Sequence, residues 1–479
     1  MHDDASNGTP DPSTDELRVA IIGGGVVGVV LALGLIHQKI SVRVYEQASE
    51  FREIGAGIAF SACARRCMHL VNPAIVSALK RCGAVPVSDE DGEDGEDGFL
   101  RWIDGYNQRC PDDPSYQKPL SEIGGAGFRG CRRDQFVNEL AKNLHPGSVA
   151  FGKRLECLEK REEDGIVVMM FADGTKAEAH AVIGCDGVKS SVRANLLGAS
   201  HPASQPQYTH KVAYRGLVSM SRALDVLGPW KAKNFHHHVG PGAHLTHYPV
   251  AEGKALNVVV FVSDPNPWPN TKSLVAEGTR DEIKAALAGW HPTVLELVGL
   301  LPDKLITWAL FDMGEYPMAA YNDGTVCLAG DAAHASSPHH GAGASAGRFC
   351  RDSLKIEDAL CLSILLAQVR QGLKAGTPAQ RLVEVAFEVF DKVRRPRTQW
   401  LVNSSRRVCD LYHQAEWADP AKWIKAETCF EEIRDRSYKI WDFDIDDMVE
   451  RTAGEVQRLH AQGTNGRAKT SMQRDGYVL

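Results

Sequence analysis

The pattern of apolar and polar positions near the start of the chain predicts a strand, a turn, a helix and a second strand. Residues 17–22 are mostly apolar and rich in β-branched types, which is typical of a buried parallel strand. After three spaced glycines, the apolar run Val26–Gln38 has the length of a helix. A second β-rich stretch, Val42–Tyr45, ends at the acidic residue Glu46. We therefore expect a βαβ unit within an α/β domain.

The glycines of this unit match the G-x-G-x-x-G pattern of dinucleotide-binding turns. Gly23 permits a tight turn, Gly25 lets a phosphate approach the backbone, and Gly28 lets the helix pack closely on the strand. The start of the helix offers N–H groups and positive dipole to a pyrophosphate. Glu46 follows about 20 residues later, where a carboxylate accepts hydrogen bonds from an adenosine ribose. An ordinary βαβ unit with packing glycines is the alternative, but it does not explain Glu46.

Two later stretches repeat the pattern of an apolar strand followed by an acid. One is residues 181–184 before Cys185-Asp186-Gly187, and the other is residues 324–330 before Asp331. Between them, Lys211–Val218, His244–Val250 and Leu256–Ser263 alternate in the way that predicts antiparallel strands. The fold that these patterns predict is a Rossmann-like nucleotide-binding α/β domain, with an inserted mixed or antiparallel β-sheet domain and a helical C-terminal region.

The expected domain boundaries follow from these changes of pattern. The division is a disordered N-terminus at 1–15, a nucleotide-binding domain at 16–204 with substrate-side loops at 86–128, a sheet domain at 205–312, the last part of the nucleotide-binding domain at 313–370, and a helical region at 371–479.

Finer features carry separate predictions. We expect one helix over Ala62–Cys82, a helix capped by Asp134, and C-terminal helices over 379–395, 398–416 and 423–438. The five histidines of the sheet domain are expected to alternate in and out along strand faces. No carboxylate or cysteine completes a ligand set at metal-binding spacing, so we expect no metal. These histidines are His236, His237, His238, His244 and His247.

Composition narrows the function classes. Net charge is −7 over 479 residues, so the balance of charge favours no general nucleic-acid partner. The longest uncharged run is the strand–turn–helix unit itself, so no membrane span is expected. The polar, acidic first 15 residues match neither a secretory signal nor a basic transit peptide. The 12 cysteines lack C-x-x-C pairs, which favours reduced thiols and a cytoplasmic location. The oligomeric state cannot be read from these features.

With its three acid-terminated strands, the chain resembles the FAD-dependent aromatic hydroxylases, the single-component flavoprotein monooxygenases of the salicylate hydroxylase type. The resemblance spans roughly residues 17–400. It rests on residues 23–46, on Cys185-Asp186-Gly187, and on Gly330-Asp331-Ala332-Ala333-His334 with Pro338. Within that family, residues 212–216 and 244–249 are most similar to fungal enzymes that hydroxylate and dearomatise phenolic polyketides on the way to azaphilones and tropolones.

The resemblance implies a role for each motif residue. FAD is the implied cofactor and NAD(P)H the co-substrate, with O2 and a small aromatic molecule as the other reactants. An arginine and a tyrosine of the substrate domain form the implied catalytic pair, here Arg215 and Tyr248. The residues implied in FAD binding are Gly23, Gly25, Gly28, Glu46, Gly57, Ala59, Arg132, Asp186, Asp331, Gly343 and Ala344.

The acid–base chemistry of phenols supports a catalytic role for Arg215 and Tyr248, and each residue also has a structural alternative. A phenol like that of tyrosine has a pKa of roughly 10, and a fixed cation lowers it. Arg215 stays charged and can grip a phenolate in a planar fork, and Tyr248 can hold the phenolate oxygen by a hydrogen bond. The alternatives are an Arg215 engaged in a surface ion pair and a Tyr248 that fills the core.

One stretch departs from the family pattern. Members run from the glycine-rich turn almost directly into an E-D-A helix, whereas here residues 348–355 intervene before Glu357-Asp358-Ala359. Because this insert follows the flavin-contacting turn, it is expected to affect FAD retention. Three functions are therefore weighed: an aromatic monooxygenase, including a decarboxylating salicylate-type hydroxylase; a non-oxygenating flavin dehydrogenase; and a flavin-free remnant.

Overall fold

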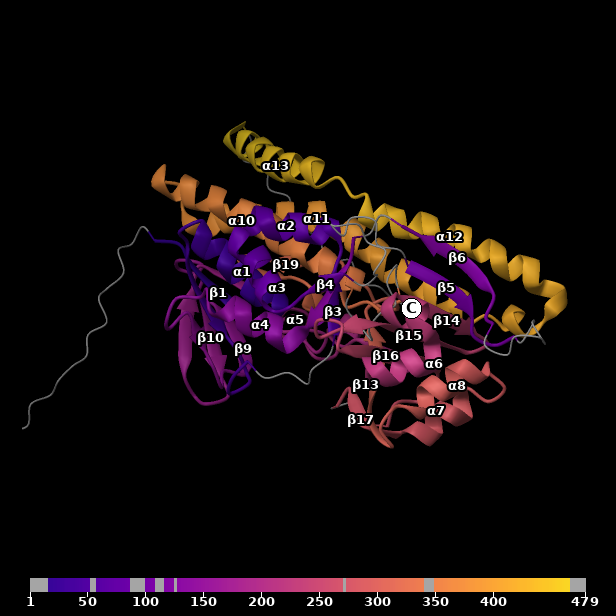
Figure 1. The fold of residues 1–479 in the computed structure, drawn as a ribbon. Helices are drawn as coiled ribbons and strands as arrows, with labels where there is room; N and C mark the ends of the chain where they lie inside the picture. Colours follow the sequence, from indigo (N-terminus) through magenta and orange to yellow (C-terminus); the bar gives the residue numbers. More distant parts are fainter. Residues whose placement is uncertain are drawn as a thin grey trace, which may run out of the picture.

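A six-stranded sheet built on the first strand carries the glycine-rich turn (Figure 1). The computed structural model describes residues 16–51, 57–86, 100–107, 116–124, 127–269, 273–339 and 349–465. The strand order is β19-β20-β12-β1-β2-β8, and every pairing is parallel except β19 with β20. The strands are β1 (Arg18–Ile22), β2 (Ser41–Tyr45), β8 (Val149–Ala150), β12 (Ala181–Gly184), β19 (Asn322–Asp323) and β20 (Val326–Leu328).

This topology brings the predicted acids to one edge. The carboxyl ends of parallel strands lie at the same edge of a sheet, and ligands bind there. Glu46 follows β2, Asp186 follows β12 and Asp331 follows β20. The predicted Rossmann-like architecture is confirmed, and its strand ends converge on the glycine-rich turn after β1.

Helices cover this sheet, and α10 crosses the first helix of the βαβ unit (Figure 1). The predicted helix over Ala62–Cys82 is in fact two helices, because Pro73 cannot continue the first one. The side chain of Asn72 accepts a hydrogen bond from the N–H of Ala74 and caps the second helix. The helices are α1 (Val26–His37), α2 (Ala62–Val71), α3 (Pro73–Arg81), α4 (Arg133–Ala141), α5 (Ser191–Leu197), α9 (Asp331–His334) and α10 (Phe349–Lys374).

Two small antiparallel sheets flank the nucleotide-binding part. One contains β9 (Leu155–Lys160), β10 (Val167–Phe171) and β11 (Lys176–Ala179). The other has the order β3-β7-β4 and contains β3 (Gly57–Phe60), β4 (Val85–Pro86) and β7 (Arg129–Arg132).

A second large sheet has eight strands in the order β17-β18-β13-β16-β15-β14-β5-β6. All its pairings are antiparallel except β14 with β5, so two strands from the first quarter of the chain extend the sheet that follows residue 205. The strands are β5 (Leu100–Asp104), β6 (Pro119–Ile123), β13 (Gln207–Ser219), β14 (His236–Gly240), β15 (Ala243–Val250), β16 (Ala255–Ser263), β17 (Val275–Thr279) and β18 (Lys304–Asp312).

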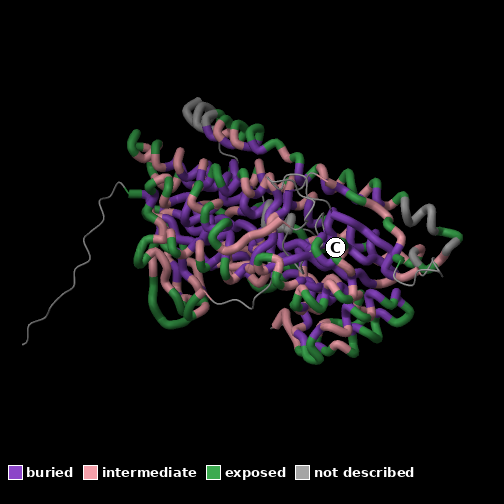
Figure 2. Tube along the Cα trace, in the orientation of Figure 1, coloured by how far each residue is buried: buried purple, intermediate pink, exposed green. Residues whose placement is uncertain are grey.

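Both faces of this second sheet are covered at its centre, where β14 and β15 are buried along their whole length and drawn in purple in Figure 2. One face packs against α6 (Met220–Lys233), α7 (Arg280–Ala286) and α8 (Pro292–Gly299). The other face packs against β3 and the C-terminal helices. All five strand histidines are therefore fully buried. The expectation that they alternate between inside and outside is wrong, because neither side of β14 and β15 reaches solvent.

The C-terminal region is helical, as predicted. A single long helix, α11 (Ala379–Tyr412), runs through Pro396, where the sequence predicted a break. Buried residues on both sides of Pro396 hold the helix together in spite of the missing N–H. It is followed by α12 (Trp423–Trp441) and α13 (Ile445–Asn465), with short 3₁₀ turns at 202–204, 415–418 and 420–422. Within the described residues, no helix combines the length and apolarity needed to cross a bilayer.

Candidate functional site

The turn between β1 and α1 is too tight for side chains. Gly23 has a φ of +105°, and a Cβ there would lie 2.5 Å from the carbonyl oxygen of Cys185. A Cβ on Gly28 would lie 2.0 Å from the carbonyl oxygen of Gly23. Helix α1 starts after Gly25 with no side-chain cap and no acidic residue in its first turn among these fully described positions. Its first N–H groups and positive dipole end suit an anionic phosphate.

Replacing Gly28 with alanine tests this packing. We expect the free energy of unfolding to fall by about 1–3 kcal/mol because the new methyl group overlaps the backbone of Gly23. Gly454→Ala is the control, since it also adds a methyl group within a helix but meets no atom within 4 Å. Urea denaturation of both variants measures the difference. Equal free energies of unfolding would show that the turn can accommodate a methyl group at residue 28.

Glu46, which follows β2, stabilises the glycine-rich turn by hydrogen bonds. Its Oε2 accepts a hydrogen bond of 2.6 Å from the N–H of Gly24, and its Oε1 accepts one of 2.8 Å from the N–H of Ala48. The carboxylate therefore holds the glycine-rich backbone in place as well as lining the cleft described below.

Asp186 follows strand β12 and caps the N-terminus of helix α5. Its Oδ2 accepts hydrogen bonds from the N–H groups of Ser191 at 2.7 Å and Val192 at 3.1 Å, and its Oδ1 accepts one from the hydroxyl of Ser190 at 2.5 Å. Burial raises the pKa of this carboxyl group, although these three donors oppose the shift. Asp186 thus has a structural task at the cleft edge in addition to any contact with a cofactor.

Asp331 is the first residue of α9, directly after Gly330 with its φ of +60°. Its Oδ2 lies 3.0 Å from Nζ of Lys355, whose side chain is only 3% exposed. Lys355 is the last residue of the insert at 348–355. The described end of the insert therefore brings a buried cation to the acid that the family resemblance links to FAD.

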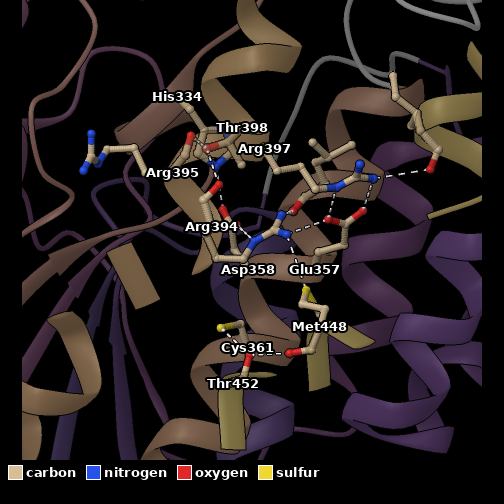
Figure 3. A network of polar contacts seen from close by, with 12 residues as sticks. His334, Glu357, Asp358, Cys361, Arg394, Arg395, Arg397, Thr398, Met448 and Thr452 are labelled. Atoms are coloured by element: carbon tan, nitrogen blue, oxygen red, sulfur yellow. Dashed lines mark hydrogen bonds and ion pairs between the residues drawn. The ribbon is translucent and has the colours of Figure 1, made fainter. Parts of the chain in front are cut away.

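A buried polar network fixes the Asp331 turn from behind (Figure 3). Oδ2 of Asp358 accepts a hydrogen bond from the N–H of Gly330 at 3.0 Å and lies 2.6 Å from Nε2 of His334. Its other oxygen accepts a hydrogen bond of 2.8 Å from Nε of Arg394 on α11. The E-D-A motif therefore acts by holding the strand end in place.

The neighbouring acid of that motif completes the network. Glu357 is fully buried and pairs with Arg394 at 2.7 Å and with Arg397 at 2.9 Å. Two carboxylates and two guanidinium groups thus join α10 to α11.

These strand ends open into one cleft of about 570 Å³. Its lining joins the glycine-rich turn to the second sheet. On the side of that sheet, the guanidinium carbon of Arg215 lies 4.7 Å from the ring centroid of Trp308, and both residues line the cleft. The site residues in the lining are Gly23, Gly25, Glu46, Arg133, Asp186, Arg215, Asp331 and Lys355.

The cleft lining contains Arg133, to which the family resemblance gave no role, and does not contain Arg132. The guanidinium of Arg132 pairs with Asp134 at 2.7 Å, outside the described lining. Arg133 is buried, and one of its terminal nitrogens would lie 3.5 Å from a Cβ on Gly25. Asp134 is not the N-cap, contrary to the prediction, because α4 starts two residues earlier, at Arg133, with Arg132 as its N-cap.

Substituting each arginine by alanine distinguishes their roles. We expect Arg133→Ala to weaken FAD binding at least tenfold, because it removes a buried cation beside the phosphate-binding turn, and such contacts are worth about 1.5–3 kcal/mol. Arg132→Ala should change the affinity less than about threefold, since a pair half open to solvent contributes little. Titration of the apoprotein with FAD, followed by flavin fluorescence, measures both. A larger loss for Arg132 than for Arg133 would support the cofactor contact that the family resemblance implies for Arg132.

The remaining predicted residues are not in the cleft lining or lie outside the described ranges. Tyr248 is fully buried and stacks on Phe235, with ring centroids 6.0 Å apart. Ala59 belongs to the same core cluster, and Gly57 starts the strand that pairs with β7. Gly343 and Ala344 fall within 340–348, outside the described residues.

The geometry fits a large anionic cofactor. A cradle without room for side chains, a helix N-terminus and the buried Arg133 suit a pyrophosphate, while Glu46 and Asp331 offer acceptors to sugar hydroxyls. The described residues contain no group of three or more His, Cys, Asp or Glu side chains arranged to hold a metal.

Known proteins similar to this chain point to the same cofactor. A family model for an FAD binding domain matches residues 133–377. Salicylate hydroxylase asL1 of Sarocladium schorii is 62% identical over 475 residues, covering 97% of this chain and 96% of the relative. The FAD-dependent monooxygenase eupB of Phoma sp is 62% identical over 449 residues, covering 92% of this chain and 98% of the relative. A solved salicylate hydroxylase substrate complex has a TM-score of 0.73 at 28% identity, covering 92% of this chain and 98% of the other.

Proposed function

The chain belongs to the FAD-dependent monooxygenases of the salicylate hydroxylase type, and from this premise we propose that it uses NAD(P)H and O2 to hydroxylate a phenolic polyketide. We further propose that hydroxylation removes the aromaticity of the ring, as a step in azaphilone-like secondary metabolism. The observation that carries the proposal is the position of Arg215, stacked on Trp308 at the end of the cleft that begins at the glycine-rich turn.

The proposed roles at the cofactor end follow from the lining. The α1 N-terminus and Arg133 would neutralise the pyrophosphate, and Glu46 would accept from the adenosine ribose. Asp331 would accept from the ribityl chain with Lys355 balancing its charge. The chemistry that FAD supplies when bound is transfer of one oxygen atom from O2.

At the substrate end, Arg215 is proposed to stabilise the phenolate. A guanidinium group favours the ionised ring electrostatically and makes the ring carbons more nucleophilic. Stacking on Trp308 restricts the plane of the guanidinium, which helps to fix which ring carbon meets the cofactor. Tyr248 is proposed to assist through a hydrogen bond to the same oxygen from the neighbouring strands.

A second candidate is decarboxylating hydroxylation of a salicylate. The relative asL1, a salicylate hydroxylase, and the solved salicylate hydroxylase substrate complex favour it. The same arginine could hold a carboxylate beside a phenol, because its fork matches carboxylate geometry. The two candidates differ in their products, since only the second releases CO2.

Anaerobic and aerobic assays of the purified holoprotein test both. We expect acyl-resorcinol aldehydes to accelerate NADH or NADPH oxidation and to gain one oxygen atom from labelled O2, with loss of aromatic absorbance. Salicylate with CO2 release would favour the second candidate. Nicotinamide oxidation without an oxygenated product from any phenol would contradict both and indicate a dehydrogenase.

The cell compartment is a further proposal. The ten cysteines recorded within the described residues are thiols that form no disulfide there, which supports a reducing, cytoplasmic environment.

A further inference from the structure

A chain of hydrogen bonds leads from the surface into the second sheet. Oγ of the exposed Ser263 lies 3.0 Å from Nδ1 of His413, at the end of α11. Nε2 of His413 lies 2.8 Å from Nδ1 of His244 on β15. The backbone holds this arrangement, because the N–H of Gly242 donates to the carbonyl of His413 at 3.2 Å, and the N–H of Ser263 donates to the carbonyl of Gly242 at 2.9 Å.

The inner end of this chain lies on the sheet face that carries Arg215. Strand register pairs Arg215 with Val259 and Val259 with Thr246, so these side chains share one face. His244 is two residues from Thr246 and points to the same side. One strand, β16, separates Arg215 from β15, which places their backbones roughly 10 Å apart across the sheet. Two long side chains at that separation can reach the same aromatic ring.

The cleft wall comes close to His244, although His244 is not itself in the lining. Pro338 lines the cleft, and the following residue, His339, packs edge-to-face on His244 with ring centroids 5.3 Å apart. His244 is fully buried, yet its Nε2 has no hydrogen-bond partner among the residues that the structure describes. A buried nitrogen in this state needs a partner, and a ligand hydroxyl group is a suitable one.

We propose that His244, His413 and Ser263 form a proton relay that carries the phenol proton of the substrate out to solvent. This inference rests on the proposed function, since it requires a phenol beside Arg215. It assigns a route for the proton that Arg215, always charged, cannot accept.

The step balances, because four successive proton transfers carry one net proton from the substrate to water. The substrate O–H bond breaks as Nε2 of His244 gains a proton, while Nδ1 of His244 passes its proton to Nε2 of His413. Nδ1 of His413 then passes its proton to Oγ of Ser263, which releases its own to water. Burial lowers the pKa of His413 to about 3 and that of His244 well below its ordinary value. Each ring is therefore neutral and has one N–H and one acceptor, as the relay requires.

Stopped-flow mixing of the FAD-loaded protein with an acyl-resorcinol aldehyde tests the relay, with phenolate absorbance as the signal. We expect His413→Gln to slow phenol ionisation roughly 100-fold, the usual scale for losing a general base, while FAD affinity stays the same. The matched control is His247→Gln, also fully buried on β15 but on the opposite face, where it contacts His238 at 3.1 Å. Its ionisation rate should stay within about threefold of the wild type. Equal rates in His413→Gln and the wild type would overturn the relay.

A wild-type measurement keeps the test valid even if a variant does not fold. The rate in H2O–D2O mixtures should curve with deuterium fraction, because several protons move together. A linear dependence would indicate a single proton transfer and overturn the relay, while an ionised, oxygenated product would leave the proposed function standing. A wild-type protein that neither ionises nor oxygenates any phenol would overturn both.

Discussion

Replacing Arg394 with methionine is expected to lower the free energy of unfolding by about 3–5 kcal/mol, because it leaves two buried carboxylates with reduced compensation. Arg394, Glu357 and Asp358 are each fully buried. Methionine keeps much of the volume, so the loss comes from charge and hydrogen bonding. FAD affinity should fall as well, since Asp358 holds the backbone of Gly330, which precedes Asp331.

The next residue provides the matched control. Arg395 pairs with Asp391 one turn earlier on α11, and its side chain is 34% exposed. Arg395→Met should cost less than about 1 kcal/mol, because exposed ion pairs contribute little. Figure 3 shows the side chain of Arg394 within the network and that of Arg395 pointing away from it. Denaturant unfolding and FAD titration of both variants measure the contrast, and equal losses would mean that the buried network is not a special contributor.

Acid stability gives a second readout of the same network. Burial opposes ionisation of Asp358, but His334 and Arg394 outweigh it and hold its pKa at about 2, below the usual 3.8. An acid with a lowered pKa stabilises the fold above its unfolded pKa and loses that contribution as pH falls through the folded value. The wild type should therefore lose this stability between about pH 4 and pH 2. Arg394→Met should begin to lose it at a higher pH.

The strand ends were predictable because their local pattern is strong. Apolar, β-branched runs that stop at Glu46, Asp186 and Asp331 indicate buried parallel strands, and parallel strands bring their ends together. The glycine spacing fixed the turn before α1 for the same local reason. These features need no knowledge of distant residues.

Other parts of the site depend on contacts between distant residues, which pattern cannot show. Arg132 is the last residue of β7 and Arg133 is the first residue of α4, and only Arg133 is in the cleft lining. Whether both faces of β14 are covered depends on α6 and α11, far along the chain. The pairing of Asp358 with Arg394 joins two helices across 36 residues. Tertiary packing decided each of these outcomes.

Removing the guanidinium of Arg215 is expected to reduce product formation at least 100-fold while FAD stays bound. The reason is that Arg215 lies on the second sheet, at the far end of the cleft from the glycine-rich turn, and is proposed to stabilise the phenolate. Loss of one such electrostatic contact commonly costs 10²–10³ in turnover. Tyr248→Phe should also retain FAD and lose hydroxylation, because it removes only the hydroxyl group. Product formation by mass and flavin content by absorbance measure both variants.

Two neighbouring substitutions control for changes in the strand itself. Tyr214→Phe removes a hydroxyl group from the residue next to Arg215 on the opposite face of β13, where Tyr214 packs against the helical side of the sheet. Arg222→Ala removes an exposed guanidinium from α6. Both should keep near-normal turnover, since neither side chain lies on the cleft face. Wild-type turnover in Arg215→Ala or in Tyr248→Phe would show that the substituted residue is not catalytic. The phenolate would then be stabilised by another group.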